Sequence, residues 1–154
     1  MIIIGYQGIG KSTLAKRRTM RCIDLESGNF FVDGKRDADW YRVYAQIAKH
    51  LSEQGYTVFV SSHKVVRDEL YGCGQVVAAC YPDLSLKDEW IAKLEARYNE
   101  SKLDKDYRAL MNAKDCYTTN ISEIIADCNE YGYDKIAITD MDHPDLSHWL
   151  LDVV

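Results

Sequence analysis

One short segment near the N-terminus combines glycines, a lysine and a serine at a spacing that suits phosphate binding. Residues 5–12 read Gly-Tyr-Gln-Gly-Ile-Gly-Lys-Ser and match the pattern G-x-x-x-x-G-K-[ST] without a mismatch. Gly8 and Gly10 allow backbone conformations that a Cβ would forbid, so that successive N–H groups can point at phosphate oxygens. The start of a following helix adds partial positive charge. The segment, called the phosphate loop below, therefore predicts a cradle for nucleotide phosphates.

The polar side chains of the phosphate loop have separate predicted roles. Lys11 is a mobile point charge that can reach the β- and γ-phosphates, and the Ser12 hydroxyl can ligate Mg²⁺. We therefore expect ATP and Mg²⁺ as cofactors, Lys11 as a catalytic residue and Ser12 as the metal ligand. The predicted nucleotide-binding residues are Gly5, Gly8, Ile9, Gly10, Lys11, Ser12 and Thr13.

The elements that must position this loop alternate between strands and helices. Apolar and β-branched runs predict strands at 2–4, 22–25, 57–61, 75–80 and 135–139. Apolar residues at helical spacing predict helices at about 11–20, 39–54, 65–70, 86–101 and 121–130, with a closing helix at 145–153. The stretch before residue 121 is charged and is expected to be less regular. This alternation predicts a three-layer α/β fold with a parallel sheet of about five strands.

Length, charge and cysteine usage exclude several classes of protein. A chain of 154 residues suits one domain, and its net charge of −5 argues against a broad nucleic-acid surface. The apolar run Met1–Ile4 is too short for a signal peptide or a membrane span. Five cysteines without a C-x-x-C pair suit a reduced protein. We expect a cytoplasmic protein without membrane attachment, and the sequence leaves its oligomeric state open.

The phosphate loop and the following Thr13-Leu14-Ala15 resemble the first strand and helix of the small P-loop kinases. That group contains the nucleoside monophosphate, shikimate, gluconate and adenylylsulfate kinases. The segment 58–70 is similar to their third strand and the arginine-bearing helix after it, particularly in gluconate kinases. The resemblance implies a strand order of 2-3-1-4-5 and an acceptor pocket at the carboxyl ends of the strands. It also implies a mobile helical lid, which we place at about residues 85–114 of the single domain 1–154.

The resemblance also implies roles for charged residues outside the phosphate loop. Asp24 is expected to orient the acceptor, assist its deprotonation or hold a Mg²⁺-bound water, and Glu26 is expected to bind the substrate. Arg67 falls where related kinases place an arginine that grips the acceptor, and its fork suits a phosphate. Arg97 or Arg108 is expected to meet the transferring phosphoryl group, with Arg97 the catalytic candidate. Each of these residues taken alone also fits an ordinary surface charge.

The strand at 57–61 ends in Ser61 and lacks the carboxylate that motor-type ATPases and GTPases place at this point. The small kinases tolerate this variation. We therefore expect an ATP-dependent phosphotransferase that moves the γ-phosphoryl group to a small acceptor, and we favour a nucleotide or a nucleoside. Two alternatives stay open: a nucleotide-binding regulatory module with little turnover, and a polynucleotide 5′-hydroxyl kinase. Aromatic residues near the acceptor region either stack on a base or belong to the core: Phe30, Phe31, Trp40 and Tyr41.

Overall fold

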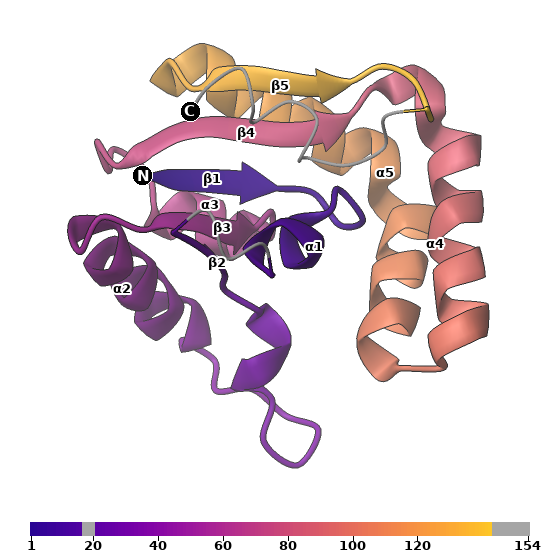
Figure 1. The fold of residues 1–154 in the computed structure, drawn as a ribbon, viewed down its shortest axis with the longest axis horizontal. Coiled ribbons are helices and arrows are strands. Elements are labelled where there is room, and N and C mark those ends of the chain that lie inside the picture. The colour runs from indigo at the N-terminus through magenta and orange to yellow at the C-terminus, as the bar shows by residue number, and fades with distance from the viewer. Residues whose placement is uncertain (17–20, 143–154) are drawn as a thin grey trace.

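The computed structural model describes residues 1–16 and 21–142, and its centre is a sheet of parallel strands (Figure 1). The strands are β1 (Ile2–Gly5), β2 (Cys22–Asp24), β3 (Thr57–Ser61), β4 (Val76–Pro82) and β5 (Asp134–Ile138). They form one sheet in the order β2-β3-β1-β4-β5, and all four pairings are parallel. This confirms the predicted α/β fold and the strand order.

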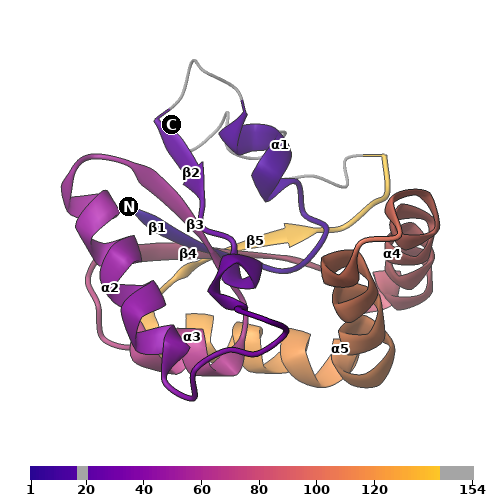
Figure 2. The ribbon, with the colours of Figure 1, turned by 90° about the horizontal axis from the view of Figure 1, so that it is seen from below.

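Helices cover both faces of the sheet. They are α1 (Lys11–Ala15), α2 (Trp40–Glu53), α3 (Lys64–Glu69), α4 (Lys87–Ser101) and α5 (Asp104–Tyr131), with 3₁₀ turns η1 (Ser27–Phe30) and η2 (Leu84–Leu86). Figure 2 shows α1 on one face and α2, α3 and the later part of α5 on the other. The expected extension of α1 to about residue 20 and the closing helix at 145–153 lie partly or wholly outside the described residues. No helix within 1–16 and 21–142 is long and apolar enough to cross a bilayer.

Strand β1 carries the phosphate loop to the middle of the sheet edge. Ile2, Ile3 and Ile4 are almost fully buried, as expected for a central strand covered on both faces. After the strand ends, the Tyr6 N–H donates to the Cys80 carbonyl at 2.9 Å, so the loop stays attached to β4. Because β3 and β4 lie on opposite sides of β1, their connections diverge here. A crevice at such a point is where open α/β sheets bind ligands.

Helix α5 differs from the prediction, which had an irregular stretch before residue 121. The helix instead starts at Asp104 and runs to Tyr131, with a kink at Cys116, whose φ is −135°. Its buried residues recur every three or four positions: Asp106, Leu110, Ala113, Tyr117, Ile121, Ile124 and Cys128. The sequence contained this spacing, but the many charged residues between the buried positions concealed it. Before the kink α5 packs along α4, and after it α5 covers the sheet (Figure 1).

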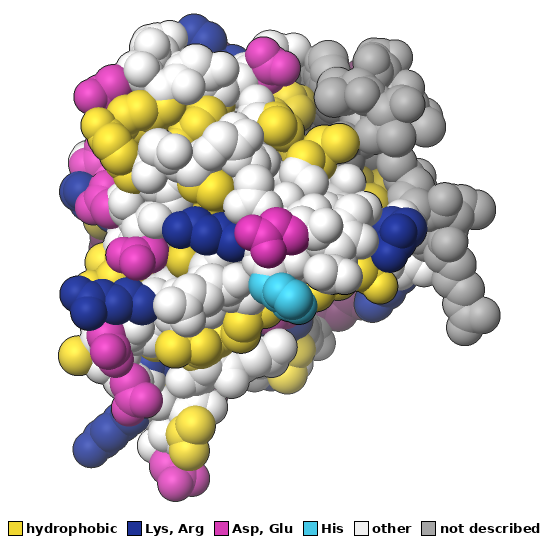
Figure 3. Space-filling model, turned by 90° about the vertical axis from the view of Figure 1, so that its left-hand side faces the viewer, with side chains coloured by type: hydrophobic (Ala, Val, Ile, Leu, Met, Phe, Trp, Pro, Cys, Tyr) yellow, Lys and Arg dark blue, Asp and Glu magenta, His cyan; other side chains and the backbone are white. Residues whose placement is uncertain are grey.

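The edge of the molecule at the amino ends of the strands has a mixed surface. Figure 3 shows Lys and Arg side chains interspersed there with Asp and Glu, between areas of apolar side chains. The phosphate loop lies at the other edge of the sheet, at the carboxyl end of β1 (Figure 1). The cavity described below lies at the carboxyl edge.

Arg67 has a structural role, which corrects its prediction as a substrate-binding residue. Its side chain is 4% exposed and lies between α3 and α5. Nε donates to the Ser62 carbonyl at 3.0 Å, and the two terminal nitrogens pair with Glu123, at 2.8 Å, and Asp127. Each of its three nitrogens therefore has a protein acceptor, and Arg67 does not line the cavity of the phosphate loop. It fastens the end of β3 to the helix that covers the sheet.

We expect Arg67→Met to lower the free energy of unfolding by about 2–3 kcal/mol, because two carboxylates and a carbonyl lose a charged donor. Urea unfolding followed by circular dichroism measures this change. Lys64→Met, on the same helix, is the control: its ion pair with Asp68 is exposed and screened by solvent, so its loss should leave the unfolding midpoint nearly unchanged. An unchanged midpoint for Arg67→Met would contradict the structural role.

Candidate functional site

The phosphate loop opens into a cavity at the carboxyl edge of the sheet. The residues after β2 and β3 form one side of it, at 24–28 and 61–63. The helical hairpin, made of α4 and the part of α5 before the kink (residues 87–116), forms another side and contributes lining residues between 97 and 112. The predicted residues of the phosphate loop, Asp24, Glu26 and Arg97 all line this single cavity. The structure therefore brings together every predicted site residue except Arg67.

The backbone of the phosphate loop needs its glycines. Gly8 and Gly10 have φ values of +84° and +92°, in the left-handed region that side chains with a Cβ rarely adopt. A Cβ on Gly5 would lie 2.6 Å from Ile9 Cδ1 and 2.8 Å from Lys11 Cδ. The loop thus curls tightly around a space beside β1, with α1 starting directly after Gly10. This shape fits the phosphates of a nucleotide.

Lys11 folds back over the phosphate loop. Its Nζ donates to the Gly5 carbonyl at 2.8 Å. Burial lowers the pKa of Lys11, while the carboxylates of Asp24 and Glu26 act in the opposite direction. A phosphate oxygen offers the ammonium group a stronger acceptor than a neutral carbonyl does. Lys11 is therefore placed to exchange the Gly5 carbonyl for a bound phosphate.

Ser12 and two carboxylates form a group of oxygen ligands at the other end of the loop. The Ser12 hydroxyl donates to Asp24 Oδ2 at 2.7 Å and lies 3.5 Å from Glu26 Oε1. Lys105 Nζ lies 3.7 Å from the same Glu26 oxygen. Hard oxygen ligands of this kind fit Mg²⁺, which keeps several waters and shares its coordination with phosphates. Within the described chain no group of three or more His, Cys, Asp or Glu could hold a metal by itself.

The helical hairpin clamps the phosphate loop from outside, through contacts that the sequence analysis did not identify. The fully buried Trp90 donates its indole N–H to the Gln7 carbonyl at 2.9 Å. The Gln7 amide donates to the Ala109 carbonyl at 3.0 Å and to Asn112 Oδ1 at 3.1 Å, and Lys93 donates to the Gly8 carbonyl. From the sequence, Trp90 is only one apolar residue of the helix predicted at 86–101. No local signal in the sequence pairs it with Gln7, because the contact spans 83 residues.

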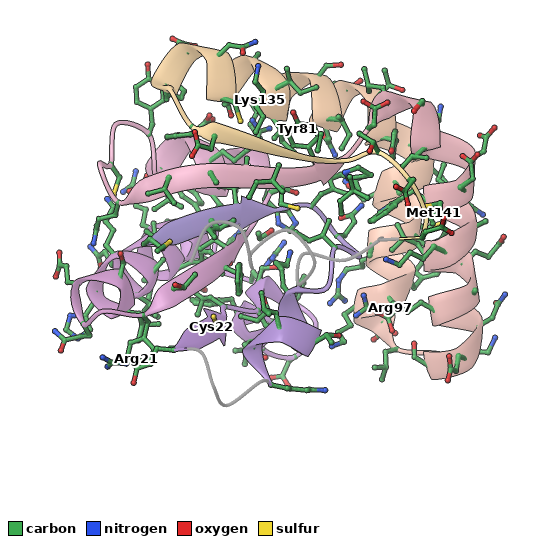
Figure 4. The ribbon with its side chains drawn as sticks, turned by 45° about the horizontal axis from the view of Figure 1, so that its top comes forward. Arg21, Cys22, Tyr81, Arg97, Lys135 and Met141 are labelled. Atoms are coloured by element: carbon green, nitrogen blue, oxygen red, sulfur yellow. The ribbon has the colours of Figure 1, made fainter. Side chains whose placement is uncertain are left out.

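Arg97 is held over the cavity by an acidic partner inside the helical hairpin. Its Nε lies 2.9 Å from Asp106 Oδ1, and Asp106 is only 5% exposed and also accepts from the Ser101 hydroxyl. The Arg97 side chain is 45% exposed and lies on the side of the hairpin that faces the phosphate loop (Figure 4). Asp106 accepts from the Nε of Arg97, so this ion pair does not use the two terminal nitrogens. Arg97 thus lines the cavity of the phosphate loop, and its contact with a phosphoryl group stays a prediction.

A further wall of the cavity holds one aromatic ring and two arginines. The Arg36 guanidinium carbon lies 4.3 Å from the centre of the Phe31 ring, and that of Arg108 lies 4.4 Å from it. We call Phe31, Arg36 and Arg108 the arginine wall. Trp40 lies beneath Arg36, at 4.0 Å, and belongs to the core together with Phe30. Arg36 was not identified from the sequence.

His63 lines the cavity between the phosphate loop and the arginine wall. The Ser61 hydroxyl contacts its Nδ1, at the end of β3, where motor-type ATPases and GTPases have a carboxylate. His63 is exposed at the cavity surface, but partial desolvation there and the nearby charges of Arg36, Lys11 and Arg108 lower its pKa to about 4. The ring is therefore neutral at pH 7. Its pKa therefore depends on the positive charges around it.

The comparisons with known proteins give no activity for this site. The chain matches no protein-family model, and no curated protein matches it. Among solved structures it is similar to the crystal structure of an uncharacterized protein from Eubacterium ventriosum ATCC 27560, at 17% identity and a TM-score of 0.46. The match covers 99% of this chain and 98% of that one. The functional interpretation therefore depends on the residues of this chain.

We expect the His63 ring to titrate with a midpoint of about pH 4, and Arg36→Met to raise that midpoint. NMR of labelled histidine side chains measures both. The unfolded chain takes up this proton at about pH 6.5. The folded state is thus favoured most above that pH and loses stability as the pH falls toward 4. A midpoint of 6.5 in the folded protein would contradict the described environment.

Proposed function

We propose that the protein is an ATP-dependent phosphotransferase that moves the γ-phosphoryl group of Mg·ATP to a small acceptor, with a nucleotide or nucleoside as the favoured class. The observation that carries this proposal is the extent of the cavity. It joins the phosphate loop to His63 and to the arginine wall, all of which line one cavity. A protein that only binds ATP needs the first part, whereas a transferase needs room for an acceptor beside it.

The phosphate loop supplies the site for ATP in this proposal. Backbone N–H groups after Gly8 and the start of α1 face the phosphates, because the two positive φ values turn them inward. Lys11 leaves the Gly5 carbonyl and pairs with the β- and γ-phosphates. Thr13, which lines the same cavity, adds a contact at the α-phosphate. These contacts hold the γ-phosphorus at the mouth of the loop, toward the arginine wall.

Mg²⁺ neutralises charge on the β- and γ-phosphate oxygens when it is bound. The Ser12 hydroxyl would be the direct ligand, and Asp24, which accepts from that hydroxyl, would orient it. Arg97, held by Asp106, stabilises the charge on the transferring group. Ser61 and His63 occupy the strand end where other P-loop proteins have a carboxylate. Asp24 would therefore supply the carboxylate that this strand end lacks.

The same proposal includes the cytoplasm as the place of action. All five cysteines are free thiols, and Cys80 and Cys128 are buried. A reducing compartment maintains thiols in this form, and it is also where ATP is abundant.

We expect Lys11→Ala to weaken Mg·ATP binding by about 10- to 100-fold, because charge-assisted hydrogen bonds to the phosphates are lost. The measurement is ADP release from Mg·ATP with a panel of acceptors: ribo- and deoxynucleoside monophosphates, nucleosides, gluconate, shikimate and a 5′-hydroxyl oligonucleotide. Lys16→Ala removes an exposed lysine after the same helix and should leave both binding and release unchanged.

Each outcome of this assay separates the candidate functions. Release stimulated by one acceptor and abolished in Lys11→Ala supports the transferase and identifies its substrate. Stimulation by the oligonucleotide alone favours a polynucleotide 5′-hydroxyl kinase. Tight Mg·ATP binding with no stimulation by any acceptor would overturn the phosphotransferase and favour a nucleotide-binding regulatory module.

We expect Asp24→Asn to raise the Mg²⁺ concentration needed for half-maximal ATP binding by about tenfold or more, since partners of metal ligands contribute 10- to 100-fold to metal affinity. Glu26→Gln is the matched comparison and should have a smaller effect, because its oxygen lies 3.5 Å from the Ser12 hydroxyl rather than 2.7 Å. The readout is a Mg²⁺ titration of binding with a fluorescent ATP analogue. Equal effects of the two substitutions would contradict the assigned role of Asp24.

A further inference from the structure

The arginine wall places two positive charges over one aromatic ring. Neither Arg36 nor Arg108 forms an ion pair with a carboxylate within residues 1–16 and 21–142. Arg36 has one long hydrogen bond, from its NH1 to the Ser27 carbonyl at 3.4 Å. Both guanidinium groups lie over the same ring, so they are close enough to repel each other. Burial and the charge of Arg108 lower the pKa of Arg36, as this repulsion requires.

The acidic residues of the cavity are already engaged elsewhere. Asp24 accepts from Ser12, Glu26 lies beside Lys105, and Asp106 holds Arg97. These are the carboxylates among the residues that line the cavity. Among the described residues these carboxylates therefore leave Arg36, which is half-buried, and Arg108, which is exposed, available to a bound anion. Two planar guanidinium forks suit a group with several oxygens, such as a phosphate.

The aromatic residues near this wall do not provide an open stacking surface. Phe30 and Trp40 pack with Tyr44 in the core, and Trp40 is 8% exposed. Phe31 lines the cavity, but the two guanidinium groups already lie over its ring. A planar ring bound here would have to displace an arginine. The arginine wall therefore suits a charged group better than a planar ring.

We propose that the arginine wall binds a phosphate monoester on the phosphoryl acceptor, so that the acceptor is a nucleoside monophosphate and not a nucleoside. This inference rests on the phosphotransferase proposed for the same cavity and names its substrate class. Arg36 comes from the segment after η1 and Arg108 from the helical hairpin, so the acceptor phosphate bridges two parts of the chain. The phosphate loop keeps the phosphates of ATP.

The reaction with such an acceptor needs no general base. An acceptor phosphate oxygen attacks the γ-phosphorus, and the bond from that phosphorus to the β,γ-bridging oxygen breaks. ADP leaves with the electron pair of that bond, and the acceptor becomes a diphosphate. The second ionisation of a phosphate monoester has a pKa of about 6, so the attacking oxygen carries no proton at neutral pH. This agrees with an Asp24 that is occupied by Ser12 instead of facing an acceptor hydroxyl.

The test measures acceptor binding to the full chain without ATP. Isothermal titration calorimetry compares nucleoside monophosphates with the matching nucleosides, for the unchanged protein, Arg36→Met and Arg108→Met. We expect at least one monophosphate to bind ten times more tightly than its nucleoside, and each substitution to weaken that binding about 10- to 100-fold. Arg42→Met, at an exposed position of α2, is the control and should bind normally. Mg·ATP affinity should change less than twofold in all three variants.

A second readout does not depend on turnover or on a variant that folds. A phosphate bound at the arginine wall neutralises the charges around His63, so the monophosphate should raise the NMR titration midpoint of that ring, and the nucleoside should not. An unmoved midpoint at saturating monophosphate would contradict the proposed place of binding.

Failure of this inference and failure of the phosphotransferase give different results. If the Arg36→Met and Arg108→Met variants phosphorylate a nucleoside or a 5′-hydroxyl oligonucleotide at the normal rate, the inference is overturned. The proposed transferase is then still supported. Absence of monophosphate binding overturns the inference, and so does a large loss of Mg·ATP affinity in the arginine variants, since it assigns the wall to ATP. Arginine-dependent monophosphate binding without ADP release supports the wall and overturns the transferase.

Discussion

The backbone of the phosphate loop is the constraint on which the rest of the structure depends. Gly8 and Gly10 keep positive φ values, which residues with a Cβ rarely adopt and which only the surrounding structure can maintain. The fold therefore holds the loop from three sides. β1 anchors it in the buried centre of the sheet, Tyr6 bonds to β4, and Trp90 and Gln7 fasten it to the helical hairpin.

This clamp explains why α5 is one long kinked helix. After Cys116 it covers the sheet through Ile121 and Ile124, and before Cys116 it leaves the sheet and packs along α4. The same helix thus connects the core to the cavity wall. Asp106 and Arg108 lie on its outer part, where one orients Arg97 and the other faces Phe31. The contacts of Gln7 with Ala109 and Asn112 fix the hairpin to the phosphate loop. Any motion of the hairpin relative to the sheet would therefore involve the part that lies farther from the sheet than these contacts.

Charge in the cavity follows one arrangement. Each carboxylate that lines it has a partner within the chain, and the three partners are Ser12, Lys105 and Arg97. Arg36 and Arg108 crowd around the neutral His63 instead. Positive charge without carboxylate partners is costly in a cavity unless a ligand neutralises it. This imbalance connects the proposed reaction with the proposed acceptor, since both partners of the transfer would be anions.

The sequence alone determined the phosphate loop, the alternation of strands and helices and, through the resemblance to small kinases, the order of the strands. Those features depend on local spacing, on glycines at fixed positions and on short buried runs, which can be read along the chain. Only the tertiary structure decided the fate of the arginines. Arg67 and Arg36 have the same guanidinium group, but Arg67 meets Glu123 and Asp127 on a distant helix, whereas Arg36 meets Arg108. Which charges become neighbours depends on contacts between segments far apart in the sequence, and no local pattern encodes them.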